Sequence, residues 1–522
     1  MRSLARIFGV IGLSFLLIFY LYPLVKLLLL SLCPDVCRSD SLFSLLRQNY
    51  YRERLWFSSY QAIFSTLLSL ALALPAAFLL SYFDFKGKHL WRNLLSLPFV
   101  MPSILVAIAF LSLVGPQGFL GIDLRNSLGI ILWAHVFYNY AVVLRLVGGY
   151  LESLGPRYLE AGAMLGASAW RNFFRLSLPL AAPAISAAAA LTFIFCFSSF
   201  GIILLLSPKA SFATLEVEIY RQSSQLLALD RAVSLAMWQL LLLSLFNLGY
   251  SYLQKRLANT LNHPKAKKQA NPKQLVLIWL YLLFSALFTL SPLVGFIYKA
   301  LSQADLATFL GLWGSSGLIG LSSAPLALFN SLGFALLSSF MALVLGLTIS
   351  YAIHRANWRW LDSFSLLPLS TSAVTLGLAY LIAFPRLAGS FWSIVIAHSL
   401  VAFPLVVRGL LASLRALAPK IIDAGRMLGS SPLKLFWRVE LPLLRASLIS
   451  SGALAFSISL GEFGAALVLS RPEYATLPIA IFERLSRPGG ASYAEALMLA
   501  LILLLISLLL SLRLDAFGDG FR

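Results

Sequence analysis

The sequence is short of charge: only 11% of its 522 residues are Asp, Glu, Lys or Arg, while 60% are hydrophobic and the mean hydropathy is +0.86. A soluble domain of this length cannot bury so much apolar surface. The composition therefore excludes a soluble globular protein and predicts an all-α integral membrane protein.

Residues that carry chemistry are also scarce, with three Cys, five His and 20 acidic residues. They show no metal-ligand spacing and no catalytic constellation, so we predict no enzyme activity, no metal and no cofactor. A phosphate-binding Gly-x-x-x-x-Gly-Lys-Ser/Thr loop is absent, since the only Gly-Lys pair, Gly87-Lys88, is followed by His89. Cys33 and Cys37 fall in one loop, where a disulfide and two separate thiols both remain open.

What the sequence does contain is a series of about twelve apolar stretches, each long enough for a helix to cross a bilayer. The length of the first favours a retained span over a cleaved signal peptide. The expected spans are Ile7–Leu32, Trp56–Tyr82, Leu94–Val114, Leu128–Val147, Leu180–Leu206, Ala232–Leu253, Leu275–Tyr298, Leu326–Tyr351, Phe364–Phe384, Phe391–Leu411, Leu443–Leu469 and Tyr493–Leu512.

The basic residues give the orientation of these spans. With a cytoplasmic N-terminus, the inside segments hold Arg2, Arg6, the run from Lys255 to Lys273 and the clusters Arg145–Arg175 and Arg408–Arg445. This is the bias that the positive-inside rule describes, and it places both termini in the cytoplasm. The net charge of +20 is therefore interpreted as topology and attraction to membrane lipid, with no nucleic-acid partner.

The chain is an internal duplication. The polar stretch 255–273 predicts a cytoplasmic linker between a first half, 1–254, and a second half, 274–522. A shift of 263 residues takes Ala134-His135 to Ala397-His398, and the match continues without a gap to Phe200-Gly201 and Phe463-Gly464. Each half would hold six spans and enter the membrane in the same direction, so the halves are expected to surround a two-fold pore.

The best-matched segments are two cytoplasmic loops, at about 150–179 and 413–442. Pro156 and Pro419 suit the first position of a short helix, which Gly166 and Gly429 would end in a left-handed conformation. Ser168 and Ser431 are expected to cap a second helix. Each loop therefore predicts a helix-turn-helix at the cytoplasmic face.

This pattern resembles the EAA loop of ABC importer permeases. The resemblance implies the type I permease fold, two copies of a cytoplasmic ATPase subunit that dock on the two loops, and a periplasmic substrate-binding protein, all at a bacterial inner membrane. Two mild departures are Gly in place of the usual third Ala and Asp423 in place of Glu160. The loop residues that carry the resemblance are Glu160, Ala161, Gly162, Gly166, Asp423, Ala424, Gly425 and Gly429.

One carboxylate, Glu462, falls inside the eleventh apolar stretch, and its counterpart in the first half is Ser199. An intramembrane acid is by default a functional candidate. We predict that Ser199, Phe200, Glu462 and Phe463 line the translocation path, with the two Phe side chains as gate; a solvated Glu462 near the outer surface is the alternative. Arg145 and Arg408 are interpreted as helix-end anchors.

Fusion of two halves narrows the resemblance to the thiamine and ferric-iron importers. The segments 197–201, 213–220 and 459–464 are similar to those of the thiamine permeases, so thiamine is the expected substrate and ferric iron the alternative. A secondary transporter driven by an ion gradient is a rival reading, but it would have no use for two docking loops.

Overall fold

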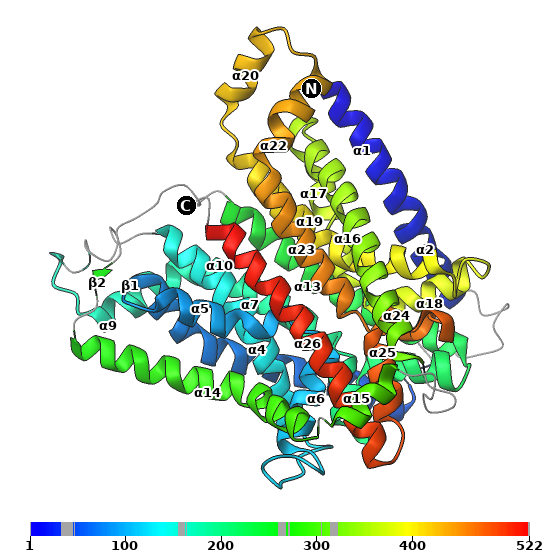
Figure 1. Cartoon of the computed structure of the whole chain (residues 1–522). Helices are drawn as coiled ribbons and strands as arrows, with labels where there is room; N and C mark the ends of the chain where they lie inside the picture. Colours follow the sequence, from blue (N-terminus) through cyan, green and yellow to red (C-terminus); the bar gives the residue numbers. More distant parts are fainter. Residues whose placement is uncertain are drawn as a thin grey trace.

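The chain is seen as a computed structural model that describes residues 2–32, 45, 47–154, 162, 164–258, 268–269, 272–303, 305–313 and 322–519 (Figure 1). Cys33 and Cys37 lie outside these residues, so their pairing stays open. The described part is almost entirely helical, which confirms the predicted all-α class.

The elements of the first half are α1 (Arg2–Leu16), α2 (Tyr22–Leu32), α4 (Asn49–Tyr82), β1 (Phe83–Asp84), α5 (Lys88–Ser96), α6 (Ser103–Val114), α7 (Leu128–Leu154), α9 (Ala169–Asn172), α10 (Leu178–Phe197), α11 (Gly201–Leu206), α12 (Leu215–Tyr220) and α13 (Leu229–Ala258). Those of the second half are β2 (Lys268–Gln269), α14 (Pro272–Gln303), α15 (Leu306–Trp313), α16 (Ala324–Arg355), α17 (Arg359–Phe364), α18 (Ala373–Ala383), α19 (Phe391–Ala416), α20 (Pro419–Met427), α21 (Pro432–Leu435), α22 (Leu441–Leu443), α23 (Arg445–Leu460), α24 (Gly464–Leu469), α25 (Leu477–Leu485) and α26 (Gly490–Asp519).

Among the described residues, nine helices are long and apolar enough to cross a membrane, and the number rises to twelve if three sharply bent pairs are each taken as one span. The prediction of about twelve spans is confirmed in that sense. The bends fall at 100° before α6, at 95° before α18 and at 70° before α23.

The third and ninth expected spans thus differ from simple helices. The chain breaks before α6 at Pro102, which has no N–H to donate, and before α18 at Ser372, whose hydroxyl accepts the N–H of Thr375 at 3.1 Å. The second legs, α6 and α18, have 12 and 11 residues, about 18 Å of helix, and are too short to span a bilayer alone. Their N-termini therefore lie inside the molecule.

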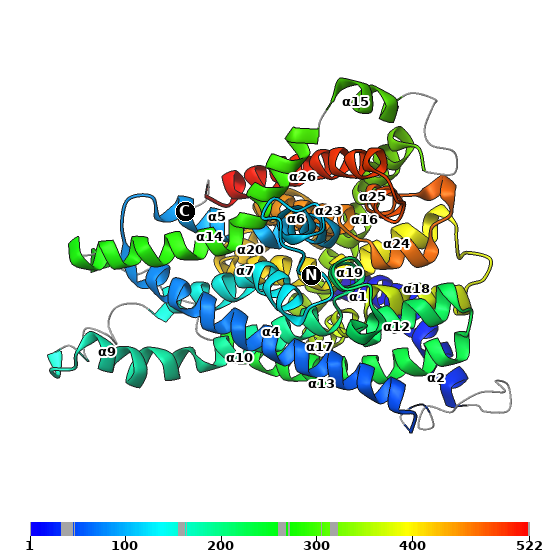
Figure 2. The same cartoon turned by 90° about the horizontal axis from the view of Figure 1, so that it is seen from below.

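The first long helix of each half packs on the other half. The α1–α2 helix runs beside α16 and α18, and α14 lies on the flank of the molecule beside α4, α5 and α6 (Figures 1 and 2). The Tyr380 hydroxyl donates to the carbonyl of Phe19 at 2.7 Å, and the indole of Trp133 donates to the carbonyl of Phe288 at 3.2 Å. The halves are therefore interlocked, which the apolar pattern of the sequence did not predict.

Much of the expected linker, 255–273, lies outside the described residues. Its described ends continue α13 to Ala258 and start α14 at Pro272. Between them, β2 pairs in parallel with β1, with Phe83 opposite Lys268 and Asp84 opposite Gln269. This two-residue ladder holds the linker against the end of α4.

Candidate translocation cavity and coupling loops

The second predicted helix-turn-helix is present in full. Pro419 is the first residue of α20, and Gly429, with φ +73°, turns the chain out of it. Ser431 then caps α21, its hydroxyl accepting the N–H of Lys434 at 3.3 Å, with Pro432 at the first helical position. This loop projects from the end of the molecule that also carries the N-terminus (Figure 1).

The first loop is described only in part, and Glu160 and Ala161 lie outside the described residues. The parts that are described repeat the geometry of the second loop. Gly166 has φ +78°, and the Ser168 hydroxyl accepts the N–H of Arg171 at 3.3 Å. A left-handed residue suits Gly because any side chain would be strained there.

Gly162 and Gly425, the departures from the usual Ala, lie against the helix that follows the turn. A Cβ on Gly162 would approach Oδ1 of Asn172 to 2.2 Å, and one on Gly425 would approach Cδ1 of Leu435 to 2.4 Å. Asn172 and Leu435 are themselves 263 residues apart. Both loops thus have Gly at the place where the chain before the turn closely approaches the short helix after it.

Each loop exposes a Met-Leu pair just before its left-handed Gly. Met164 and Leu165 are 89% and 87% exposed, and Met427 and Leu428 are 89% and 85% exposed. Flexible, fully exposed apolar side chains outside the membrane-spanning helices are typical of a docking surface. Asp423, on α20, is also exposed and lies 3.2 Å from Nη1 of Arg426.

A cavity of about 270 Å³ lies between the two halves, and all four predicted path residues line it: Ser199, Phe200, Glu462 and Phe463. They come from the breaks between α10 and α11 and between α23 and α24, where the chain is not helical. The N-terminal ends of the short helices α6 and α18 reach the same cavity through Ser103 and Ala373.

Glu462 is buried, so the alternative of a solvated carboxylate near the outer surface is wrong. Its two oxygens accept the backbone N–H groups of Ala465 and Ala466, both at 3.0 Å, at the start of α24. Its Oε2 also lies 3.2 Å from Nε2 of His398, whose Nδ1 lies 2.9 Å from the hydroxyl of Ser459. A carboxylate placed in this way is fixed in direction and partly compensated in charge.

The aromatic pair brings the halves into contact at the cavity. Phe200 and Phe463 stack with ring centroids 5.5 Å apart. Gly201 makes this approach feasible, since a Cβ there would lie 3.1 Å from Cδ1 of Phe463.

The polar residues of the cavity wall that were missed include Glu216, His135 and Asn139. All three are almost completely buried. A signal for His135 was available, because the duplication aligns it with His398. Glu216 shares a short stretch with Glu218, and the sequence did not tell which carboxylate faces inward.

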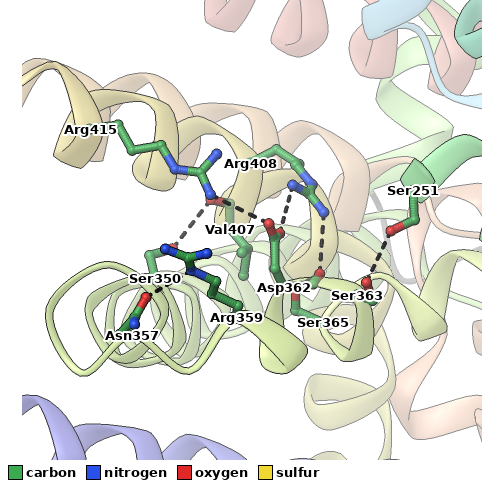
Figure 3. A network of polar contacts seen from close by, with 10 residues as sticks. All are labelled: Ser251, Ser350, Asn357, Arg359, Asp362, Ser363, Ser365, Val407, Arg408 and Arg415. Carbon is green, nitrogen blue, oxygen red and sulfur yellow. Dashed lines mark hydrogen bonds and ion pairs between the residues drawn. The ribbon is translucent and has the colours of Figure 1, made fainter. Parts of the chain in front are cut away.

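Arg408 lies towards the C-terminal end of α19, where an ion pair holds its side chain. Its Nη1 lies 2.8 Å from Oδ1 of Asp362 on α17, and Arg415 reaches the other oxygen of the same carboxylate at 3.4 Å (Figure 3). In the first half, Arg145 lies over the ring of Phe99, 5.6 Å from its centroid. Neither Arg lines the cavity.

The fold and the paired loops correspond to a known class. The family described as "Binding-protein-dependent transport system inner membrane component" matches residues 69–261. This match and the relatives below support an ABC importer permease, a multi-pass inner membrane protein that is similar to the permease subunits of transporters. An ion-gradient carrier has no support in this match.

Several relatives are similar over nearly the whole chain. The thiamine transport system permease protein ThiP of Haemophilus influenzae is 27% identical over 507 residues, covering 91% of this chain and 90% of the relative. ThiP of Escherichia coli is 26% identical over 481 residues, covering 85% of this chain and 86% of the relative. A putative 2-aminoethylphosphonate permease, PhnV of Salmonella paratyphi A, is 30% identical over 168 residues, 31% of this chain and 63% of its own length.

Proposed function

We propose that this chain carries thiamine across the inner membrane after a periplasmic binding protein delivers it, and that two copies of a separate cytoplasmic ATPase drive the step. The two halves, 1–254 and 274–522, would form the two sides of one pathway. The similarity to thiamine permeases along nearly the whole chain supports this substrate. Both termini would face the cytoplasm, on the side of the two loops.

The observation that carries the ATPase assignment is the pair of exposed Met-Leu motifs. Each pair lies directly before a left-handed Gly and a capped short helix. A rigid element that presents apolar side chains can transmit movement from a docked partner to the helix that follows it, here α10 or α23. The loops at 150–179 and 413–442 would thus be the two coupling sites.

The cavity at the Phe200–Phe463 stack would be the pathway. It is lined by residues of both halves, as a two-fold pore requires. Substrate would pass when the two halves separate and the stacked rings part.

The deciding experiment is ATP hydrolysis and uptake in liposomes that hold this chain with its ATPase, with the binding protein added outside. Thiamine and ferric iron are compared as ligands. We expect thiamine alone to stimulate ATP hydrolysis and to accumulate. Stimulation by ferric iron alone would replace the substrate, and uptake without any ATPase would overturn the mechanism.

The coupling loops are tested by reversing both carboxylates, Glu160→Lys with Asp423→Lys. We expect the double variant to insert in the membrane normally but to lose ATP-driven uptake, because the loop lies in solvent and contributes little to folding. Glu473→Lys, a charge reversal at an exposed position outside both loops, is the single-site control. Unchanged uptake in the double variant would contradict the docking role.

A further inference from the structure

Two carboxyl side chains line the central cavity. The carboxyl and imidazole side chains that line it are those of Glu216, Glu462 and His135, and neither Lys nor Arg lines it in the described part of the chain. Unpaired charge in a low-dielectric interior is costly and is kept where it has a partner or a function.

The two carboxylates differ in how they are compensated. Glu462 lies 3.2 Å from the His398 imidazole and also accepts two backbone N–H groups. Glu216, at 0% exposure, has neutral partners in the described part of the chain: the amide of Gln239 donates to Oε2, and the Ser372 hydroxyl and the N–H of Val374 face the same carboxylate. Glu462 lies near enough to repel it. Unlike Glu462, Glu216 therefore has no imidazole or other basic side chain among these partners.

Two other side chains of the cavity wall have buried polar atoms with no hydrogen-bond partner among the described residues. Nε2 of His135 and Oδ1 of Asn139 are buried without a hydrogen-bond partner among the described residues, although both side chains line the cavity. His135 is fixed by its other nitrogen, which lies 3.0 Å from the hydroxyl of Ser65, and the Asn139 amide donates to the carbonyl of His135. Buried polar atoms of this kind are normally satisfied, so a bound molecule is a natural partner.

Aromatic rings form a further part of the wall. Phe99, Tyr138, Phe195, Phe200 and Phe463 all line the cavity. Ring faces attract cations and stack on flat heterocycles. The volume of about 270 Å³ is close to the lower end of the range for small-molecule pockets, about 300 Å³.

From this combination we propose that the cavity is a binding site of the permease itself for a small aromatic cation, with Glu216 as its anionic contact and His135 and Asn139 as hydrogen-bonding contacts. The inference rests on the proposed function and extends it: thiamine, a cationic thiazolium joined to an aminopyrimidine, matches both the charge and the polar groups. Selectivity would then be exercised twice, by the binding protein and by the membrane pathway.

The test is equilibrium binding of radiolabelled thiamine to the purified permease–ATPase complex in detergent, without nucleotide and without the binding protein. The competitors are the uncharged 4-amino-5-hydroxymethyl-2-methylpyrimidine and the unrelated aromatic cation N-methylpyridinium. We expect the wild type to bind thiamine at least tenfold more tightly than the uncharged pyrimidine. Equal affinities would overturn the proposal without any variant.

Two substitutions sharpen the test. Glu216→Gln should weaken binding of both cations at least tenfold and leave the uncharged pyrimidine unaffected. The matched control is Glu218→Gln, which changes the neighbouring carboxylate of α12; Glu218 accepts from Tyr50 and Gln222 and does not line the cavity. Glu216→Asp keeps the charge and should keep the preference for cations. Equal cation binding by Glu216→Gln and Glu218→Gln would overturn the role of Glu216.

Failure of this inference is separable from failure of the proposed substrate. If the wild-type transporter accumulates thiamine but its cavity shows no dependence on Glu216, only the inference falls. If thiamine is not transported but N-methylpyridinium binds in a manner that depends on Glu216, the cation site stands and the substrate must be replaced.

Discussion

Phe200 and Phe463, which occupy the same place in the two halves of the duplicated sequence, stack on each other with their planes 25° apart. Each follows a broken helix and precedes a Gly that starts the next short helix, α11 or α24. The contact thus joins the two halves at the wall of the cavity. The contact can serve as a gate only if the two rings separate readily.

Removal of both rings should loosen this contact. An aromatic pair contributes about 0.5–1.5 kcal/mol beyond its buried area, so Phe200→Ala with Phe463→Ala is expected to raise the open population by up to about tenfold. The measurement is uptake of substrate by liposomes in the absence of the binding protein, which should rise above the wild-type leak.

The control for that variant is Phe246→Ala. Phe246 stacks on Phe193 at 3.8 Å, but neither residue lines the cavity. A similar leak in both variants would mean that loss of any aromatic pair loosens the protein, and the gate would have no support.

Gly425 offers a steric test of the coupling loop. In Gly425→Val the new side chain would collide with Leu435, because even a Cβ approaches Cδ1 of that residue to 2.4 Å. We expect α20 to be displaced and ATP-driven uptake to fall severalfold, with membrane insertion retained. ATP hydrolysis and uptake measured together will show whether coupling is lost.

Rescue distinguishes a collision from general damage. Adding Leu435→Ala removes the atom in the way, so the double variant should recover most of the lost uptake. If the double variant transports no better than Gly425→Val alone, the close packing of the two short helices is not what the Gly provides.

The duplicated sequence predicted these loops and the Phe pair because both depend on local chemistry: Pro, Gly and Ser at fixed offsets, and matching residues in two copies. Glu216 was missed for a physical reason. It and Glu218 lie two positions apart on a six-residue helix, so they point in nearly opposite directions, and only the packing of α12 decides which faces the cavity. Likewise, the breaks before α6 and α18 fall at Pro102 and Ser372, inside stretches whose mean hydropathy is that of a continuous span.

In each half an ion pair links a short helix to a long helix, with its charges exchanged. Arg92 of α5 bonds to Glu152 near the end of α7, whereas Asp362 of α17 bonds to Arg415 near the end of α19. Glu152 and Arg415 are 263 residues apart. Each pair joins a short helix to the helix that leads into a coupling loop.

This exchange of charges predicts that the ion pair stabilises the protein whichever of its two positions carries the cation. Arg92→Glu should place two carboxylates together and lower stability by about 1–2 kcal/mol, since the pair is only partly buried, and Glu152→Arg alone should do the same with two cations. The combined variant, which copies the polarity of the second half, should recover more than half of the loss. Thermal unfolding in detergent measures the stability of each variant. If the loss of stability in the double variant equals the sum of the two single losses, the pairing is contradicted.

The interlocked first helices give a final prediction, on assembly. Because α1 and α2 pack on α16 and α18, the second half lacks part of its packing when residues 2–32 are missing, and the first half likewise depends on α14. A cut between residues 258 and 268 leaves α13, β2 and α14 intact. We expect neither fragment to accumulate alone, and both to accumulate and co-purify when they are produced together.

A sharper test removes residues 2–32 from the first fragment, which should reduce recovery of the second fragment. Gly9 closely approaches Trp358 at this surface, where a Cβ on Gly9 would lie 2.7 Å from the indole ring. Gly9→Leu in the first fragment should therefore weaken the assembly of the two fragments. The control is Gly149→Leu, which should not weaken it because the space around Gly149 is open. Independent accumulation of either fragment would show that a half is stable without the other's helix.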